Sequence, residues 1–523
     1  MNVAARLTDQ ARRRPGTPAL ADRRRGGTRV VTFGELERQV AAVAGWMHAN
    51  GVRDGAAVFV LVPPSVELYV AIAAALRAGG QVVAAELSAG APVWRYAVEA
   101  TQPVLLVASP LAAWWRLTQR PLRRVPRALV AGWAPGATSF AAAATHAPLD
   151  TVARPPDAPA LVTFTSGTTG VPKGVVRTHA ILAAQLDALR GTTAAAGEVD
   201  LGNLPIVTLA NLANGATSVL PAADPRRAAQ FDPRPVLAQC ARHGVTRFTA
   251  SPAFLARLVS VPHPALAAIT RVVTGGGPLF PDVLAAVQAA VPRAAVTAVY
   301  GSTEAEPIAH RDIAPGAHDD AAAAARGEGL LAGRPDAVVQ VMVIPEGTMP
   351  QAPMTPAQWA ALDAPPGSAG EVVVAGPHVV RHYVQGRGEA ETKLRVGDVT
   401  WHRTGDLARR DAEGRLWLLG RAGVGGSGDS ALHPVAVEAA VRALFPVRQA
   451  AALVHGGRRV LVLVPRAGSR VGAEEVRAAL GWARLDDVYV VSALPVDRRH
   501  QYKVDYPAVR RMLDRRRARP RET

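Results

Sequence analysis

The sequence predicts an α/β protein: a large N-terminal body of mostly parallel, helix-covered sheets plus a small β-barrel-like part, and a small mobile α+β C-terminal domain. Three patterns predict this. Apolar runs alternate with Ala-rich helical segments, short alternating strands replace them from about residue 368, and a glycine-rich stretch follows. With 523 residues and 49% hydrophobic content, the chain is long for one compact core. We therefore divide it into residues 1–421, a large N-terminal body, and residues 422–523, a small mobile C-terminal domain.

The N-terminal body is predicted from strand–loop–helix units. The clearest units span residues 56–80, 247–260 and 271–291, each with a short apolar run before a helical segment. Repeated units of this kind predict parallel strands covered by helices. From about 368 to 421, short alternating strands with Gly and Asp turns predict antiparallel hairpins or a small barrel.

The glycine-rich stretch 423–428 is the predicted joint between the two domains. After it, the sequence predicts a helix at 433–445, a strand at 458–465, a helix at 472–483 and a last strand at 486–494. These elements suffice for a small α+β domain of roughly 100 residues.

Composition argues against several classes of protein. The formal charge is +17, from 59 basic and 42 acidic residues, but the arginines are scattered without an aromatic-interleaved basic stripe, so no nucleic-acid partner is expected. The single cysteine, Cys240, excludes an intrachain disulfide or a cysteine-based metal cluster and is expected to be buried. The N-terminus has charges where a secretory signal needs an apolar run, and the longest uncharged stretch, 128–149, contains Gly and Pro. No transmembrane segment is predicted, and the expected location is cytoplasmic.

Residues 163–176, TFTSGTTGVPKGVV, combine hydroxyls, glycines and one lysine between a predicted strand and a predicted helix. Glycines let the backbone approach a ligand closely, and hydroxyls with an ammonium suit phosphate oxygens. This is not a Walker loop, because Pro172 stands where that motif has its second glycine and Gly174 follows the lysine. A Gly/Thr-rich surface turn remains the plain structural alternative. The candidate phosphate-binding residues are Thr165, Ser166, Gly167, Thr168, Thr169, Gly170 and Lys173.

Lysine is rare in this chain, which has 56 arginines but only the lysines 173, 393 and 503. A compact ammonium fits a tight pocket that a planar guanidinium cannot enter. Two of the three, Lys173 and Lys503, fall in candidate site motifs. The alternative for Lys503 is a solvated surface cation.

The chain resembles the adenylate-forming enzymes, which include acyl-CoA synthetases, luciferases and nonribosomal adenylation domains. The resemblance runs over most of the sequence, in the order and spacing of that family. The segments that carry it are TFTSGTTGVPKGVV (163–176), VVTGGGPL (272–279), VYGSTEAEP (299–307), GEVVVAGPHVVRHY (370–383), HRTGDLARRDAEGRLWLLGR (402–421) and PVDRRHQYKVDY (495–506).

The resemblance implies a role for each candidate residue. It implies that Thr303 holds the α-phosphate and Glu304 the Mg²⁺ ion, and that Lys503 is the catalytic lysine of the mobile domain. The remaining nucleotide contacts it implies are Gly275, Gly276 and Gly277 beside adenine, Tyr300 stacked on adenine, and Asp406 with Arg421 at the ribose. Structural alternatives stay open for single residues: Tyr300 as a core aromatic, Glu304 as a charge at a helix N-terminus, and Asp406 as a turn residue.

The implied chemistry activates a carboxylic acid with ATP and Mg²⁺. The carboxylate attacks the α-phosphorus, pyrophosphate leaves, and an acyl-adenylate forms. Two anions meet in this step, so catalysis depends on positioning and charge compensation. Because Lys503 lies on the predicted small domain, domain motion could deliver or withdraw it.

The acid is expected to be hydrophobic. Residues 203–221 and 251–258 occupy positions that line the acyl pocket in the resembled family, and both are strongly apolar. They favour a fatty or other hydrophobic acid, although both could simply be core elements.

For the acceptor of the acyl group, the sequence leaves an internal hydroxyl and an external thiol as alternatives. Gly423 and Val424 stand where the family hinge has a Lys-Asp pair, and the segment 420–434 is one residue shorter, which argues against a thioester step. Residues 221–258 and 495–506 look like those of the olefin-pathway β-lactone synthetases, in which the β-hydroxyl of the acid displaces AMP. The alternatives are a ligase for CoA or an acyl carrier protein, and a nucleotide-binding protein without catalysis.

Overall fold

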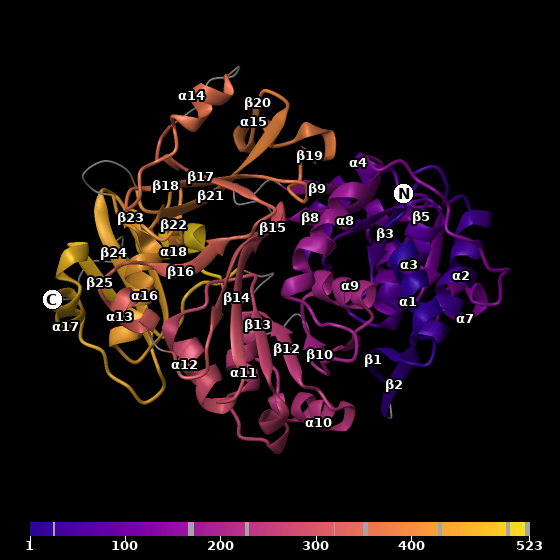
Figure 1. The fold of residues 1–523 in the computed structure, drawn as a ribbon, viewed down its shortest axis with the longest axis horizontal. Helices are drawn as coiled ribbons and strands as arrows, with labels where there is room; N and C mark the ends of the chain where they lie inside the picture. The colour runs from indigo at the N-terminus through magenta and orange to yellow at the C-terminus, as the bar shows by residue number, and fades with distance from the viewer. Residues whose placement is uncertain are drawn as a thin grey trace.

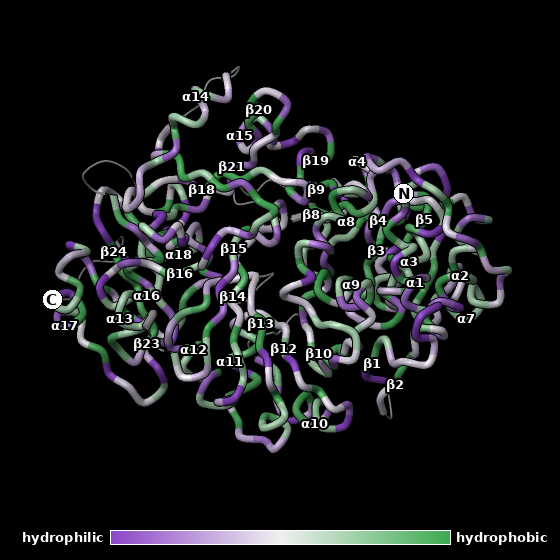
Figure 2. The backbone as a smooth tube through the Cα atoms, viewed as in Figure 1, coloured by the Kyte–Doolittle hydropathy of each residue, from purple (hydrophilic) through white to green (hydrophobic). Residues whose placement is uncertain are grey.

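The computed structural model describes residues 1–24, 27–165, 172–224, 230–317, 319–348, 354–426, 431–497 and 503–517. Two large sheets and one small sheet are covered by helices, and the C-terminal elements lie on the opposite side of the molecule from β5 (Figure 1). Hydrophobic residues concentrate along the strands (Figure 2), and buried hydrophobic residues of strands and helices form the core. The predicted α/β class is confirmed. Among the described residues, no helix combines the length and the apolar character needed to cross a membrane.

The first large sheet has a parallel centre and an antiparallel edge. Its strand order is β19-β9-β8-β4-β3-β5-β6-β7. Strands β8, β4, β3, β5, β6 and β7 run parallel to their neighbours, while β9 pairs antiparallel with β8 and with β19. The bounds are β3 (Ala57–Leu61), β4 (Gln81–Ala84), β5 (Leu105–Ala108), β6 (Arg127–Val130), β7 (Thr138–Ser139), β8 (Pro159–Thr165), β9 (Lys173–Thr178) and β19 (His382–Tyr383).

The second large sheet follows the order β17-β18-β21-β22-β16-β15-β14-β13-β12-β10-β11-β1-β2, with β20 paired to β21. The run from β14 to β1 is parallel, and the remaining pairs are antiparallel. The bounds are β1 (Pro18–Arg24), β2 (Gly27–Thr32), β10 (Val199–Gly202), β11 (Thr217–Val219), β12 (Arg247–Ala250), β13 (Arg271–Thr274), β14 (Ala295–Ser302), β15 (Ala305–Ile313), β16 (Leu330–Pro335), β17 (Gln340–Pro345), β18 (Ala369–Ala375), β20 (Lys393–Val396), β21 (Val399–Arg410) and β22 (Leu416–Arg421).

The helices of the body cover these sheets and often begin at a capping residue. Thr32 caps α2 with a reciprocal contact to Glu35, and Ser65 and Ser109 cap α3 and α5. The bounds are α1 (Ala5–Arg13), α2 (Phe33–Ala49), α3 (Val66–Arg77), α4 (Gly90–Thr101), α5 (Pro110–Thr118), α6 (Arg120–Arg123), α7 (Phe140–Ala143), α8 (His179–Ala188), α9 (Pro205–Asn214), α10 (Pro233–His243), α11 (Pro252–Leu258), α12 (Pro281–Ala290), α13 (Asp319–Ala325), α14 (Pro356–Ala360) and α15 (Glu389–Thr392).

A third sheet, β23-β24-β25, and three helices form what we name the terminal lobe. The bounds are α16 (Pro434–Leu444), β23 (Val447–His455), β24 (Arg458–Pro465), α17 (Ala473–Ala479), β25 (Asp487–Val490) and α18 (Tyr506–Arg517).

The terminal lobe packs on the body through α16. Asp282 of the body accepts from Arg442 Nε and Nη2, both at 3.0 Å, and from Arg466 Nη2 at 3.0 Å. The Arg442 guanidinium lies 4.1 Å above the Phe280 ring, and Phe280 shares an apolar cluster with Ala439 of α16. An ion-pair and apolar contact therefore joins the two parts.

Two sequence-based expectations need correction in detail. Lys173 and Gly174 were expected in a loop, but they begin β9, because Lys173 pairs with Thr165 of β8 in an antiparallel register. Strands β18, β20, β21 and β22, within the predicted range of about 368–421, pair antiparallel as expected and extend the second large sheet. The helix expected at 472–483 ends at Ala479 and continues as one 3₁₀ turn. Cys240 is buried, as predicted.

Candidate functional site

Tyr300, Asp406 and Arg421 form one polar contact at the end of β14. Tyr300 Oη donates to Asp406 Oδ2 at 2.8 Å, and Arg421 Nη1 donates to Asp406 Oδ1 at 2.8 Å. Asp406 and Arg421 are register partners on β21 and β22, so the sheet itself sets their contact. Burial, together with the Asp406 carboxylate, raises the pKa of Tyr300 well above its usual value, which keeps the phenol a donor. Because a carboxylate has about four acceptor positions, Asp406 could still accept from two hydroxyl groups of a ligand.

The glycines 275 to 277 follow β13, beside the C-terminal end of β14. A Cβ on Gly275 would lie 3.0 Å from the carbonyl oxygen of Val299, so the residue must be small. Gly276 has φ +79°, a conformation that side chains disfavour. Within the described part of the chain, the buried hydroxyls of Thr274 and Ser302 have no hydrogen-bond partner. Unpaired buried hydroxyls at this position suit a ligand with polar groups.

Glu304 lies in the turn between β14 and β15 and is held by its side chain and its backbone. Tyr383 Oη donates to Glu304 Oε1 at 3.0 Å, and Thr392 Oγ1 lies 3.3 Å from the same phenol oxygen. The carbonyl oxygen of Glu304 accepts from the Val380 backbone N–H at 2.8 Å. Burial and the Glu304 charge raise the pKa of Tyr383, so it remains a donor toward that carboxylate.

Lys173 and Lys393 share the Tyr383 ring. Their ammonium nitrogens lie 5.6 Å and 5.0 Å from its centroid, within the range of cation–π contacts. Lys393 Nζ also donates to the carbonyl oxygen of Val380, whose N–H donates to Glu304. A Cβ on Gly388 would come within 2.6 Å of Lys173 Cε, so that glycine leaves room for the lysine. Burial lowers the pKa of Lys393 to about 8.

Lys503 belongs to the terminal lobe. Its carbonyl oxygen accepts from the Asp497 N–H at 2.8 Å, and Val496 pairs with Val504 in an isolated antiparallel bridge. Burial raises the pKa of Glu306, two residues after Glu304, while the charges of Arg177 and Lys503 oppose that shift.

Arg177 links β9 to the same turn. Its Nη1 donates to Thr163 Oγ1 at 3.0 Å, and its Nη2 donates to the carbonyl oxygen of Thr303. Arg177 is buried, so this contact fixes the backbone of Thr303 against the first large sheet.

The structure therefore brings most of the predicted site residues to the β14–β15 turn. The other predicted phosphate-binding residues of the loop lie outside the described residues: Ser166, Gly167, Thr168, Thr169 and Gly170. Of Thr165, only the backbone is described. Sequence reasoning missed Arg177, Tyr383 and Thr392, and it noted Lys393 only for the rarity of lysine. Their contacts join segments that are far apart in sequence, and no local pattern shows such pairings.

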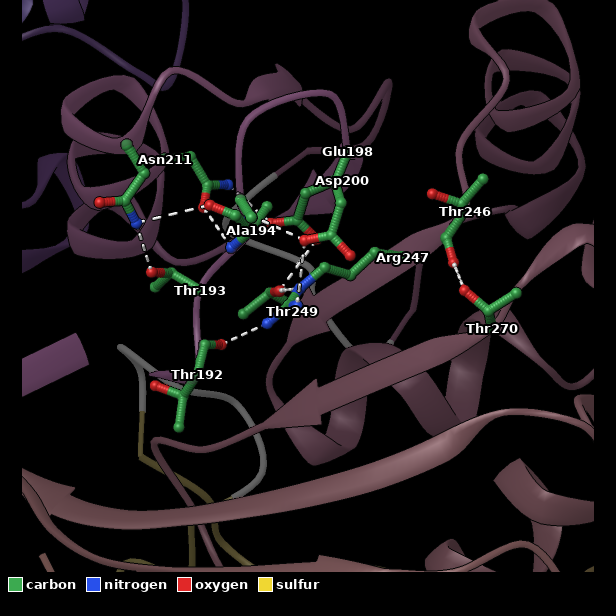
Figure 3. Close-up of polar contacts among 12 residues, drawn as sticks. Thr192, Thr193, Ala194, Glu198, Asp200, Asn211, Thr246, Arg247, Thr249 and Thr270 are labelled. Atoms are coloured by element: carbon green, nitrogen blue, oxygen red, sulfur yellow. Dashed lines mark hydrogen bonds and ion pairs between the residues drawn. The ribbon is translucent and has the colours of Figure 1, made fainter. Parts of the chain in front are cut away.

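A buried polar network contacts α9, which is part of the segment predicted to line the acyl pocket (Figure 3). Asp200 on β10 accepts from Asn211 Nδ2 at 2.8 Å and from Thr249 Oγ1 at 2.9 Å. The fully buried Arg247 donates to the carbonyl oxygen of Thr192. Burial raises the pKa of Asp200 to about 6. The network ties α9 to β10 and β12, so it gives that segment a rigid support.

The β14–β15 turn offers the carboxylate of Glu304 to a metal ion. Among the residues that the structure describes, no group of three or more His, Cys, Asp or Glu side chains could hold a metal. Mg²⁺ commonly binds through one or two carboxylates together with substrate phosphates and water. Glu304, a single carboxylate whose partner Tyr383 also contacts the ammonium groups of Lys173 and Lys393, fits that mode of binding.

The helix-covered sheets, with a carboxylate and lysines gathered at the β14–β15 turn, are those of an adenylate-forming enzyme. Residues 7–384 match the family model described as AMP-binding enzyme. The chain therefore belongs to the AMP-binding enzyme family, and it is an AMP-forming acid ligase.

Curated relatives and solved structures agree with this family. An olefin beta-lactone synthetase from Stenotrophomonas maltophilia (strain K279a) is 32% identical over 446 residues, covering 80% of this chain and 79% of that protein. A feruloyl-CoA synthase from Amycolatopsis sp is 29% identical over 500 residues, covering 88% of both. A benzoate CoA ligase from Burkholderia xenovorans LB400 has a TM-score of 0.80 at 22% identity, covering 98% of this chain and 100% of that chain, which shows the fold.

Proposed function

We propose that this protein adenylates a hydrophobic carboxylic acid with ATP and Mg²⁺, and then closes the acyl-adenylate to a β-lactone. The acid is a fatty acid with a β-hydroxyl group. The observation that carries the first step is the gathering of Glu304, Lys173 and the Asp406–Arg421 pair around one turn. The similarity to an olefin beta-lactone synthetase supports the second step.

In the first step, a carboxylate oxygen of the acid attacks the α-phosphorus. The bond from that phosphorus to the bridging oxygen breaks, and pyrophosphate leaves with the electron pair. Glu304 would hold Mg²⁺, and the ion would offset phosphate charge when bound. Lys173 and the hydroxyls of the 165–170 loop hold the departing phosphates, and Lys503 stabilises the charge at the α-phosphate and the entering carboxylate.

The nucleotide is oriented by the residues at the ends of β13, β14 and β21. Gly275, Gly276 and Gly277 border adenine, Tyr300 stacks on it, and Thr303 contacts the α-phosphate. Asp406 accepts from the ribose hydroxyls while Arg421 holds its other oxygen.

In the second step, the β-hydroxyl oxygen of the acyl-adenylate attacks the acyl carbon. A carbon–oxygen bond closes the four-membered ring, the bond between the acyl carbon and the phosphate oxygen breaks, and AMP leaves with that electron pair. The hydroxyl loses its proton to a base in the cleft or to water.

Tyr383 and Lys393 are positioning residues for the first step. Tyr383 donates to one carboxylate oxygen of Glu304. Lys393 donates to the carbonyl oxygen of Val380, a residue that also contacts the turn. Residues 1–421 form the proposed adenylation domain, and residues 422–523 form the proposed mobile domain that carries Lys503.

A thioester ligase for CoA or an acyl carrier protein is the second candidate, because the similarity to the feruloyl-CoA synthase covers 88% of this chain. Pyrophosphate exchange over a panel of fatty and β-hydroxy fatty acids tests the first step. Mass detection of the lactone with and without CoA tests the second. We expect lactone and AMP without any thiol; AMP release that requires CoA would establish the thioester ligase, and no exchange with any acid would overturn both.

A further inference from the structure

Helix α5 exposes large apolar side chains to solvent. Leu111, Trp114 and Leu117 are 57%, 47% and 59% exposed, and their spacing of three residues places them along one side of the helix. The opposite side is packed: Ala112 is buried, and the Trp115 ring stacks on Trp94 at 5.0 Å.

Trp133 extends this side of the helix. It is 72% exposed, the largest value among the exposed large hydrophobic residues. Strands β5 and β6 pair in parallel, α5 follows β5, and Trp133 follows β6. A Cβ on Gly132 would lie 2.8 Å from the Pro110 ring, so this loop touches the start of α5. We name Leu111, Trp114, Leu117 and Trp133 the apolar face.

The surroundings of the apolar face carry positive charge. Between Glu99 and Asp150 the sequence has no Asp, Glu or Lys, and it has five arginines. They are Arg116, Arg120, Arg123, Arg124 and Arg127, of which all but the partly buried Arg116 are exposed.

Two of these arginines have defined contacts. Arg116 donates to the carbonyl oxygens of Val125 and Pro126, which ties the end of α5 to the loop before β6. Arg124 pairs with Glu99 at 3.1 Å. The charge of the group therefore stays positive.

We propose that the apolar face and its arginines bind the surface of an anionic lipid bilayer. Tryptophan and leucine favour the boundary between headgroups and acyl chains, while arginine stems lie along the apolar side chains and leave the charge at the phosphates. This inference does not depend on the proposed function. It gives the protein a place at the membrane surface.

A second copy of the chain fits the face less well. A symmetric contact through the same face would set the five arginines of one copy against those of the other, and like charges repel across an interface. The absence of carboxylates in residues 100–149 instead complements a surface that carries only anions.

Sedimentation of the full chain with lipid vesicles tests the proposal. The vesicles are neutral phosphatidylcholine, or phosphatidylcholine with about 30% phosphatidylglycerol, a content that gives a negative surface potential. We expect binding to the anionic vesicles only, weakening with added salt. Arg120→Gln with Arg123→Gln should lower the partition coefficient about fivefold per arginine. Trp114→Ser with Leu117→Ser should abolish measurable binding.

Control variants separate the face from a general effect of charge or apolar area. Val399 is 43% exposed and Arg395 is exposed elsewhere on the body, so Val399→Ser with Arg395→Gln should bind vesicles like the wild type. All variants should keep wild-type pyrophosphate exchange and urea midpoints, because β5 lies away from the β14–β15 turn in Figure 1.

Four results would overturn the proposal. Wild-type protein that fails to bind anionic vesicles, or that binds neutral vesicles equally, leaves no role for the arginines. A wild-type dimer that becomes a monomer in Trp114→Ser with Leu117→Ser assigns the face to a second copy. Retention on polyglutamate without vesicle binding assigns it to an acidic protein.

Discussion

The two lysines predicted for the site are held in different ways. Lys173 begins β9, and its side chain lies between the Tyr383 ring and Gly388, so the body alone sets its position. Lys503 lies on the terminal lobe, whose contact with the body passes through Asp282, Arg442 and the Phe280 cluster. The contacts of Lys173 lie within the body, whereas the position of Lys503 depends on how the terminal lobe contacts the body. In the proposed mechanism, the phosphate side of the site is therefore preorganised, and docking of the lobe completes the reacting centre.

Replacing Lys503 should give the largest effect. We expect Lys503→Ala to lower kcat for pyrophosphate exchange on the order of 10²- to 10³-fold, because the charge acts on the transition state. The dissociation constant for ATP, measured by calorimetry, should change little. Unchanged exchange would remove Lys503 from the mechanism, and Lys503→Arg is the control for shape.

Replacing Lys173 should act more on binding than on rate. Lys173→Ala removes a charge held against the body, so we expect the KM for ATP to rise on the order of tenfold while kcat falls less. The same kinetic assay measures both constants. A loss of kcat equal to that of Lys503→Ala would erase the difference between the two lysines.

Replacing Tyr383 tests the positioning of Glu304. Tyr383→Phe keeps the ring under both lysines but removes the donation to Glu304, so we expect kcat to fall about tenfold at limiting Mg²⁺ and less at saturating Mg²⁺. Tyr96→Phe is the matched control, because the Tyr96 phenol donates to the Val384 carbonyl oxygen at 3.1 Å and not to Glu304. Equal Mg²⁺ profiles for the two variants would show that Tyr383 does not position Glu304.

Replacing Asp282 tests the docking of the terminal lobe. Asp282→Ala leaves the mostly buried Arg442 without its carboxylate, and we expect kcat for exchange to fall several-fold with an unchanged KM for ATP. Asp487→Ala serves as the control, since Asp487 pairs with Arg458 inside the lobe at 2.6 and 2.9 Å. If both variants behave alike, the Asp282 contact does not govern docking.

Replacing Asp200 should affect stability and leave the chemistry intact. The pKa of Asp200 is about 6 in the folded protein, above the 3.8 of an exposed Asp, so the folded state keeps a proton that the unfolded state has lost. The contribution of Asp200 to the free energy of unfolding therefore falls by about 3 kcal/mol as the pH rises from about 4 to about 6.

The Asp200→Asn variant lacks the carboxyl group, so no proton is gained or lost at this position between about pH 4 and pH 6. The difference in free energy of unfolding between wild type and Asp200→Asn, from urea titrations at several pH values, should follow that slope. The exposed Asp398→Asn should follow the wild type. A difference that stays constant over this range would contradict the buried, protonated Asp200.

Local sequence patterns predicted much of the fold. The run at 56–80 becomes β3 and α3, the run at 271–291 becomes β13 and α12, and α16 and β24 lie where helix and strand were expected. Such elements are set by apolar periodicity and capping within a short window. The strand β9 was missed because its partner β8 lies across the loop, and a pairing of this kind is not visible from one strand alone.

By itself, the sequence determined the chemical groups that this protein offers to a ligand. Its motifs contain the glycines at 275–277 and the acids Glu304 and Asp406, and its three lysines are the few ammonium groups among many guanidinium groups. The covalent structure alone sets which donors and charges exist. Only the tertiary structure decided that Tyr383, Arg177 and Lys393 support the turn. Those contacts join residues up to 126 positions apart, and their energies exist only once burial removes competing water.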